Sequence, residues 1–219
     1  LHKIGHATLL EHVMLSASTL EPEKTVVVVG HEAKMVADLA RDIDDAVLIV
    51  EQKEQLGTAH AVSQAKEILN GFNGDILVLY ADTPFIKPET INSIKEARKK
   101  ADLVVLGFDS KEPGRYGRII ANGRHIRKIV EFKDASEAER ELTLCNSGVM
   151  AGPASLIISL IGQVKNENAA GEYYLTDCIE LANTQGKSAM VVRCSETETL
   201  GVNSRLDLAL AEAEFQKKA

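Results

Sequence analysis

The stretch from residue 25 to residue 50, TVVVVGHEAKMVADLARDIDDAVLIV, contains the repeating unit of the fold. The β-branched run TVVVVG ends in glycine and predicts a buried strand. HEAKMVADLA then places Met35, Val36 and Leu39 on one side of a helix. AVLIV, residues 46–50, predicts a second buried strand. Strands that are apolar throughout and separated by helices predict a parallel sheet that is covered on both faces.

The same alternation continues through residue 108. ILVLY, residues 76–80, and DLVVLGF, residues 102–108, predict two more strands. Between them, KPETINSIKEARKK predicts a helix with Pro88 near its first turn and basic residues in its last turn. LGTAHAVSQAKEIL, residues 56–69, predicts a turn followed by a helix.

The pattern changes in the second half. Asn122-Gly123 lies between two strand-like runs, which predicts a hairpin. The capping-box spacing of SEAE, residues 136–139, predicts a short helix. CNSGVMAG and SAMVVRC predict strands, and PASLIISLIGQV, YLTDCIELANTQG and NSRLDLALAEAEFQKK predict helices. We therefore predict an α/β fold of one domain over residues 1–219, with a doubly wound, Rossmann-like, mostly parallel sheet and a small antiparallel insertion.

Composition excludes several classes of protein. The 219 residues are 45% hydrophobic, which suits a single domain with a real core. The net charge of −7, without a basic stripe, argues against a nucleic-acid or membrane-surface partner. No apolar run is long enough to span a bilayer, and the start of the sequence has no signal-peptide layout. Cys145, Cys178 and Cys194 lack zinc or disulfide spacing, which predicts reduced thiols in a cytoplasmic protein.

Asp82 follows the apolar run in DILVLYADTPFI, residues 75–86. In open parallel sheets, ligands bind beyond the carboxyl ends of the strands. A carboxylate there is a candidate ligand for magnesium, since Mg²⁺ is typically held by one or two carboxylates and substrate phosphates. The alternative is that Asp82 only turns the chain, because Asp before Thr-Pro favours a turn. The residues alone favour neither interpretation.

Gly57 and Thr58, in EQLGTAHAV, form a second candidate site. Glycine lets the backbone approach a ligand closely, and the first N–H groups of the following helix suit a base or a phosphate. An ordinary helix N-cap after a glycine turn is the favoured alternative. His60, on the same helix, carries no predicted role.

Three weaker motifs contain further candidates. Gly117 in RYGRI opens a strand with little side-chain bulk, which fits either a sugar ring or a bend. GEYYLTD, residues 171–177, places two aromatic residues and a hydroxyl before a helix, with Thr176 as a possible cap. Asn203 in GVNSR is most simply an N-cap, and its amide oxygen is also a possible metal ligand.

Two large enzyme classes lack their signatures. No Ser-His-Asp or Cys-His order is convincing, and neither GxGxxG nor GxxxxGK[ST] occurs. These absences argue against a triad hydrolase and a P-loop NTPase. Nucleotidyl transfer stays open, because it depends on positioning and charge neutralisation more than on a covalent nucleophile.

Taken in order, the motifs resemble one family over essentially the whole chain. The family is the N-terminal uridyltransferase domain of the bacterial bifunctional N-acetylglucosamine-1-phosphate uridyltransferase / glucosamine-1-phosphate acetyltransferase. GEYYLTD and LGTAHAV distinguish it from other sugar-nucleotide pyrophosphorylases. The other matching motifs are LHKI, YADTPFI, RYGRI, IVEFKDA, NSGVMA and GVNSR.

The resemblance implies transfer of UMP from UTP to N-acetylglucosamine 1-phosphate, giving UDP-N-acetylglucosamine and pyrophosphate for cell-wall or envelope precursors. It implies in-line attack on the α-phosphate, with Mg²⁺ neutralising charge. Asp82 and Asn203 match the family's metal-binding, catalytic positions. The matches to the nucleotide site are Gln52, Gln55, Gly57, Thr58, Tyr80 and Ala81. The matches to the sugar site are Gly117, Glu131, Asn146, Tyr174, Thr176 and Asn203.

The sequence departs from the family pattern in three places. Ala81 stands where the family usually has glycine, and we interpret its methyl as harmless because the acid beside it is retained. The family has a first strand and a glycine-rich phosphate loop before LHKI, so residues 1–219 lack both, and we expect the physical protein to contain them. No hexapeptide repeats of the acetyltransferase β-helix occur, so we assign no acetyl transfer, and the homotrimer formed by that domain is not expected from this piece.

Two alternatives to this function stay open. One is a related nucleotidyltransferase that uses another sugar phosphate or nucleotide. The other is a non-catalytic fragment that binds nucleotide or sugar without turnover, because the residues that grip the phosphates are missing. Tests of substrate range and of pyrophosphate release separate them.

Overall fold

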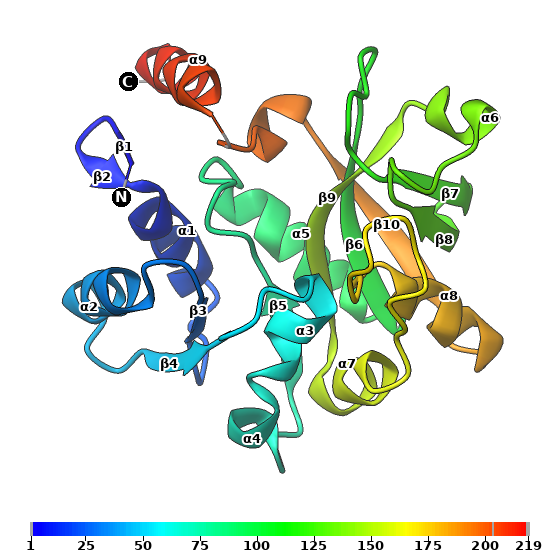
Figure 1. Cartoon of the computed structure of the whole chain (residues 1–219), viewed down its shortest axis with the longest axis horizontal. Coiled ribbons are helices and arrows are strands. Elements are labelled where there is room, and N and C mark those ends of the chain that lie inside the picture. Colours follow the sequence, from blue (N-terminus) through cyan, green and yellow to red (C-terminus); the bar gives the residue numbers. More distant parts are fainter. Residues whose placement is uncertain (1, 203, 218–219) are drawn as a thin grey trace.

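The computed structural model describes residues 2–202 and 204–217 (Figure 1). Helices and strands follow the predicted order closely. In chain order they are β1 (Lys3–Ile4), β2 (Ala7–Thr8), α1 (Leu9–Ser18), β3 (Val26–Val29), α2 (Ala33–Ile43), β4 (Leu48–Glu51), α3 (Thr58–Ser63), α4 (Lys66–Leu69), β5 (Asp75–Val78), α5 (Pro88–Arg98), β6 (Leu103–Asp109), β7 (Arg118–Asn122), β8 (His125–Val130), α6 (Glu137–Arg140), β9 (Leu144–Pro153), α7 (Ala154–Ile161), α8 (Asp177–Thr184), β10 (Ala189–Cys194), the 3₁₀ turn η1 (Glu196–Thr199) and α9 (Arg205–Gln216).

The larger sheet has six strands in the order β5-β9-β6-β10-β8-β7. β6 and β10 pair in parallel, and β9 runs antiparallel between β5 and β6 (Figure 1). β7 and β8 form the predicted hairpin, which turns at Gly123 with φ of 62°. The α/β fold with an antiparallel insertion is therefore confirmed, and the sheet is mixed because β9 separates strands that share one direction.

Helices cover both faces of this sheet, as predicted. Successive residues of β6 point to opposite faces, because a strand has a two-residue period. Leu103 and Val105 belong to a core cluster with residues of α7 and α8, whereas Val104 and Leu106 pack in a second cluster with residues of α5. The continuous apolar sequence of β6 is thus explained by burial on both sides.

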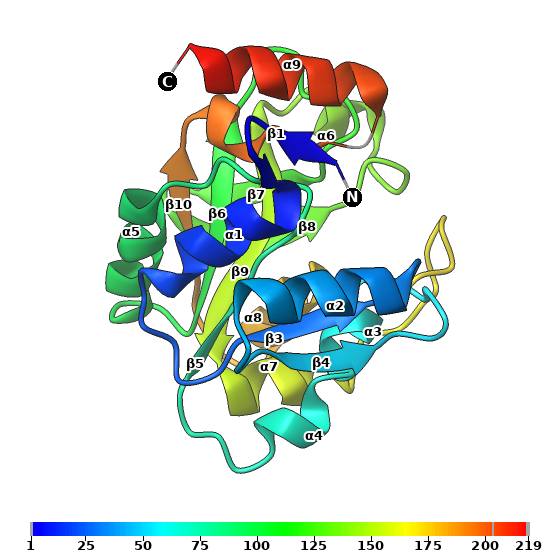
Figure 2. The same ribbon diagram turned by 90° about the vertical axis from the view of Figure 1, so that its left-hand side faces the viewer.

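β3 and β4 form a separate parallel pair, with Val26 to Val29 opposite Leu48 to Glu51. Figure 2 shows α2 running alongside this pair. Side chains of β3 and β5 line one cleft of ≈ 510 Å³, and no strand of the described residues lies between them. The predicted strand and loop before LHKI fall outside the described residues and stay a prediction.

The helix expected after the turn within residues 56–69 is two short helices, α3 and α4. Ser63 Oγ and Gln64 Nε2 both donate to the carbonyl of His60, at 2.7 Å and 2.9 Å. The backbone N–H of Gln64 instead bonds Ala61 O at 3.2 Å. Side chains therefore compete with the next turn of the helix, which ends α3.

The two ends of the described chain lie together. Glu212 of α9 accepts a hydrogen bond from the backbone N–H of Gly5 at 2.7 Å, and Ile4, Val202 and Ala211 share a small apolar cluster. Figures 1 and 2 both show α9 beside β1. Within residues 2–202 and 204–217, no helix is long and apolar enough to cross a bilayer.

Candidate functional site

Four candidate residues meet at the ends of β7, β8 and β9. Thr176 Oγ1 donates to Glu131 Oε1 at 2.9 Å, and Asn146 N donates to Gly117 O at 2.9 Å. A Cβ on Gly117 would lie 3.2 Å from Glu131 Oε2, so the glycine leaves room for the carboxylate. Asn146 and Thr176 are buried. We call Gly117, Glu131, Asn146 and Thr176 the acidic side of the site.

Negative charge gathers around Glu131. Burial, and then the charges of Asp134 and Glu172, raise the pKa of the Glu131 carboxyl. Burial and nearby carboxylates also raise the pKa of Tyr174 to about 12 and that of Asp177 to about 6. Tyr174, predicted from the sequence, therefore joins this side, whereas Asp134, Glu172 and Asp177 were not predicted. The spacing of Asp177, one residue after Thr176, was the only signal available for it.

A second group follows β4 and carries amides rather than carboxylates. Gln52 is buried, and its Nε2 donates to the carbonyl of Gly57 at 3.0 Å. Gln55 Nε2 donates to the carbonyl of Gln52 at 3.2 Å. We call Gln52, Gln55, Gly57 and Thr58 the amide side. The structure brings these four residues together.

Backbone contacts join the two sides. Thr58 Oγ1 accepts from Leu175 N at 2.9 Å, and Ala59 N donates to Tyr173 O at 2.9 Å. Gly57 has φ of 115°, and a Cβ there would lie 2.6 Å from Tyr173 O. The close approach allowed by Gly57 is thus to Tyr173. The prediction that Thr58 caps α3 is wrong, because its hydroxyl bonds Leu175 N and the Ala59 N–H bonds Tyr173 O. Thr176, at the start of α8, makes no side-chain cap bond either, and its hydroxyl donates to Glu131.

Tyr80 lies where the two sides meet. Burial raises its pKa to about 12, against a hydrogen bond with Thr58, and the charges of Glu131 and Asp82 raise it further. A Cβ on Gly148 would lie 2.8 Å from the Tyr80 ring, so Gly148, with φ of 91°, is a further residue that shapes the site. Gly148 occurs within NSGVMA but was given no role from the sequence.

Asp82 and Ala81 follow Tyr80 in the loop after β5. Ala81 is exposed. Burial raises the pKa of the Asp82 carboxyl, and no ion pair to it is found in the described part of the chain. The loop also turns, since Thr83 N and Oγ1 both donate to Tyr80 O, at 3.2 Å and 3.0 Å. The Asp82 carboxylate itself accepts a hydrogen bond from its own backbone N–H, which lowers its pKa against the larger effect of burial.

The carbonyl of Asp82 accepts from Val202 N at 2.9 Å, which brings the C-terminal segment to this loop. Asn203, predicted as the second metal ligand, lies outside the described residues. The helix that follows begins with Ser204 as its N-cap, whose Oγ accepts from Asp207 N at 3.1 Å. Among the described residues, no three His, Cys, Asp or Glu side chains gather closely enough to hold a metal ion.

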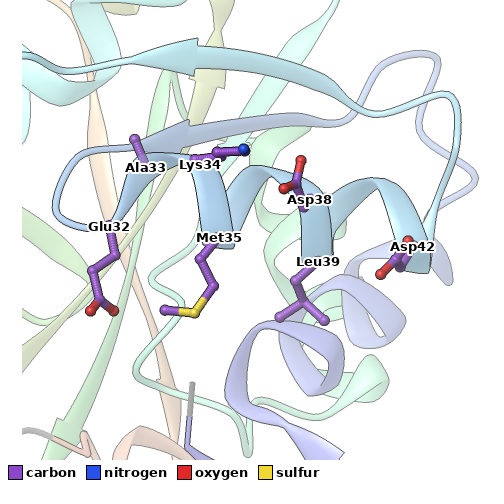
Figure 3. A pocket seen from close by; sticks show the side chains of 7 residues that line it. All are labelled: Glu32, Ala33, Lys34, Met35, Asp38, Leu39 and Asp42. Carbon is purple, nitrogen blue, oxygen red and sulfur yellow. The ribbon is translucent and has the colours of Figure 1, made fainter.

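Two cavities among the described residues do not coincide with the predicted site residues. A hollow of ≈ 770 Å³ lies over α2, where Met35 and Leu39 point to the same side of the helix (Figure 3). None of the predicted site residues lines this hollow. Of the predicted residues, Ala81 alone lines the cleft between β3 and β5. The side-chain contacts, rather than the hollows, therefore define the candidate site.

Residues 1–147 match a family model described as a MobA-like NTP transferase domain. The chain belongs to this family. Over its full length it is 56% identical to the bifunctional protein GlmU of Ruegeria sp. (strain TM1040), and 53% identical to that of Cereibacter sphaeroides (strain ATCC 17025 / ATH 2.4.3). It spans 49% and 48% of these relatives, about half of their length.

Solved structures support the fold of this NTP transferase domain. A UDP-glucose pyrophosphorylase complexed with UDP-glucose superposes with a TM-score of 0.79 at 18% identity, covering 100% of this chain and 90% of that one. The inositol-1-phosphate CTP transferase from T. maritima superposes with a TM-score of 0.77 at 15% identity, covering 99% and 85%. At such low identity, these structures bear on the fold alone.

Proposed function

We propose that the protein is a nucleotidyltransferase that converts UTP and N-acetylglucosamine 1-phosphate to UDP-N-acetylglucosamine and pyrophosphate. The observation that carries this proposal is the junction of an amide side with an acidic side through Thr58, Leu175 and Tyr80. Identity above 50% to two GlmU proteins supports the same activity. The divalent metal would be Mg²⁺, and the enzyme would act in the cytoplasm. The homotrimer would form through the acetyltransferase domain of the longer family protein.

The acidic side suits a neutral sugar. Glu131 offers carboxylate oxygens to hydroxyl groups, and Asn146 offers an amide that both donates and accepts. Glu131 already accepts from Thr176, which holds it in one orientation. The carboxylates nearby would repel a second phosphate, so the sugar ring, rather than the nucleotide phosphates, belongs on this side.

The reaction needs little covalent chemistry from the protein. An oxygen of the sugar 1-phosphate forms a bond to the α-phosphorus of UTP, the bond from that phosphorus to the bridging oxygen breaks, and the electron pair leaves with pyrophosphate. Positioning by the two sides supplies the in-line geometry. A bound Mg²⁺ would neutralise charge on the phosphates.

The donor set fits such a cation. Asp82 is a partly buried carboxylate with no ion pair among the described residues, and its pKa is raised by burial. A buried charge without a partner is costly, and a cation relieves that cost. Asp82 would hold Mg²⁺, and Asn203 would be its second protein ligand.

Pyrophosphate release from UTP and N-acetylglucosamine 1-phosphate tests the proposal. We expect activity that depends on Mg²⁺, a loss of about 100-fold or more in Asp82→Ala, and no change in the matched control Asp45→Ala, which alters an exposed aspartate. Full activity in Asp82→Ala would contradict the metal assignment. A panel of other nucleotides and sugar phosphates identifies a related transferase, and nucleotide binding without pyrophosphate release identifies a non-catalytic fragment.

A further inference from the structure

Both amide protons of Gln52 are used within the chain. Its Nε2 lies 3.0 Å from Gly57 O and 3.0 Å from Nδ1 of His60. Because a carbonyl oxygen only accepts, the contact with Gly57 identifies the nitrogen end of the Gln52 amide. The second proton then points at His60 Nδ1, so this ring nitrogen must accept, and the ring proton lies on Nε2.

The oxygen of the same amide is left open. No described residue donates to Oε1 of Gln52, although the residue is only 8% exposed. Among the described residues, Nε of Arg98 is a fully buried side-chain atom without a hydrogen-bond partner, but Oε1 of Gln52 is not. Because Oε1 of Gln52 also lacks a donor, it must be in part accessible to solvent. A buried residue thus presents one hydrogen-bond acceptor outward.

We propose that His60 is a positioning residue that holds the Gln52 amide with its acceptor oxygen toward the nucleobase. On the other side of the ring, Nε2 of His60 lies 3.2 Å from Nε2 of Gln64, but that amide nitrogen donates to His60 O at 2.9 Å and to Ser63 Oγ at 3.2 Å, so both of its protons are used. His60 lies on α3, directly after the loop that carries Gly57 and Thr58. This inference rests on the proposed function, which places the uridine nucleotide on the amide side.

The orientation of Gln52 determines which base is favoured. Uracil carries an N–H at position 3, which can donate to Oε1 of Gln52. Cytosine has a bare nitrogen at that position, so two acceptors would face each other. Sites that hydrogen-bond a substrate N–H reject an analogue that lacks it, because their polar group is then left unpaired. His60 would therefore contribute to preference for UTP over CTP without touching the base.

Calorimetric titration of the protein with UTP and with CTP, with Mg²⁺ present, tests this role. We expect His60→Leu to lower the preference for UTP about fivefold, the effect of one lost hydrogen bond, through weaker UTP binding with CTP binding unchanged. His60→Asn, whose Oδ1 can accept near the position of Nδ1, should keep the preference. The matched control His125→Leu changes an exposed histidine on β8. An unchanged preference in His60→Leu, or an equal loss in His60→Asn, would overturn the inference.

The tautomer of His60 provides a second test that does not depend on activity. Long-range ¹H–¹⁵N NMR spectra at neutral pH should show the proton on Nε2 and a bare Nδ1. A proton on Nδ1 would overturn the inference whatever the nucleotide preference. A wild-type protein that fails to prefer UTP would instead overturn the proposed function, and the NMR result would still report on the contact between His60 and Gln52.

Discussion

The amide side and the acidic side of the site are joined by hydrogen bonds from Leu175 N to Thr58 Oγ1 and from Ala59 N to Tyr173 O, but they differ in charge. Gln52, Gln55, Gly57 and Thr58 bring no ionisable group, whereas Glu131 shares its surroundings with Asp134, Glu172 and Asp177. In the proposed function, this difference means that fixed dipoles of the amide side would recognise the base, whereas carboxylates of the acidic side would hold the sugar. Protonation of Asp177 should therefore change the acidic side as the pH falls toward 6.

The largest effect on stability should come from Gly57→Ala, which changes a residue at the junction between the two sides. The new Cβ would lie 2.6 Å from Tyr173 O and 2.7 Å from Tyr173 N, at φ of 115°. We expect the free energy of unfolding to fall by about 3 kcal/mol, because backbone atoms cannot move aside. Gly71→Ala is the matched control, since its φ is also positive, at 75°, and nothing lies within 4 Å. Urea denaturation measures both, and equal losses would show that the contact with Tyr173 is unimportant.

Thr58→Val should weaken the same junction less. It removes the acceptor of the Leu175 N–H, which is then left without its bond. We expect a loss of about 2 kcal/mol in unfolding free energy, the cost of an unsatisfied donor. Hydrogen exchange at the Leu175 amide should become faster by the factor that corresponds to the same loss of free energy. Protection of that amide at the wild-type level would contradict the role of Thr58.

Glu131→Gln should separate the two sides by their ligands. Glutamine keeps the shape of the Glu131 side chain but replaces the carboxylate, which accepts from Thr176 and would accept from sugar hydroxyls, with a neutral amide. We expect KM for N-acetylglucosamine 1-phosphate to rise about tenfold, with KM for UTP unchanged. The control Glu137→Gln alters an exposed glutamate of α6. A rise in KM for UTP of the same size would show that the division between the sides is wrong.

The smallest effect concerns pH. The pKa of Asp177 is raised from 3.8 to about 6 by burial and by neighbouring carboxylates, so between these values the folded state binds more protons than the unfolded state. Stability contributed by Asp177 is therefore present at pH 4 and lost as the pH rises to 7. Allowing for its partial exposure, we expect roughly 1 kcal/mol. Relative to wild type, Asp177→Asn should become more stable as the pH is raised, measured by denaturation at both pH values.

Much of the fold could be predicted because its signals are local. The apolar run DLVVLGF at residues 102–108, the Asn122-Gly123 turn and the capping box at Ser136 each report on neighbouring residues. The break between α3 and α4 was missed, because it depends on which carbonyl the Ser63 and Gln64 side chains reach. The direction of β9 was also not predicted, since a buried strand looks alike in both orientations.

The sequence by itself determined the α/β class and the order of the elements, and the family motifs led to the prediction of the site residues. Only the tertiary structure decided their partners: Thr58 with Leu175, Thr176 with Glu131, and Gln52 with His60. The physical reason is that strands and helices follow from side-chain patterns a few residues long. A hydrogen bond between residues 117 apart in the chain depends on how the whole sheet brings two loops together.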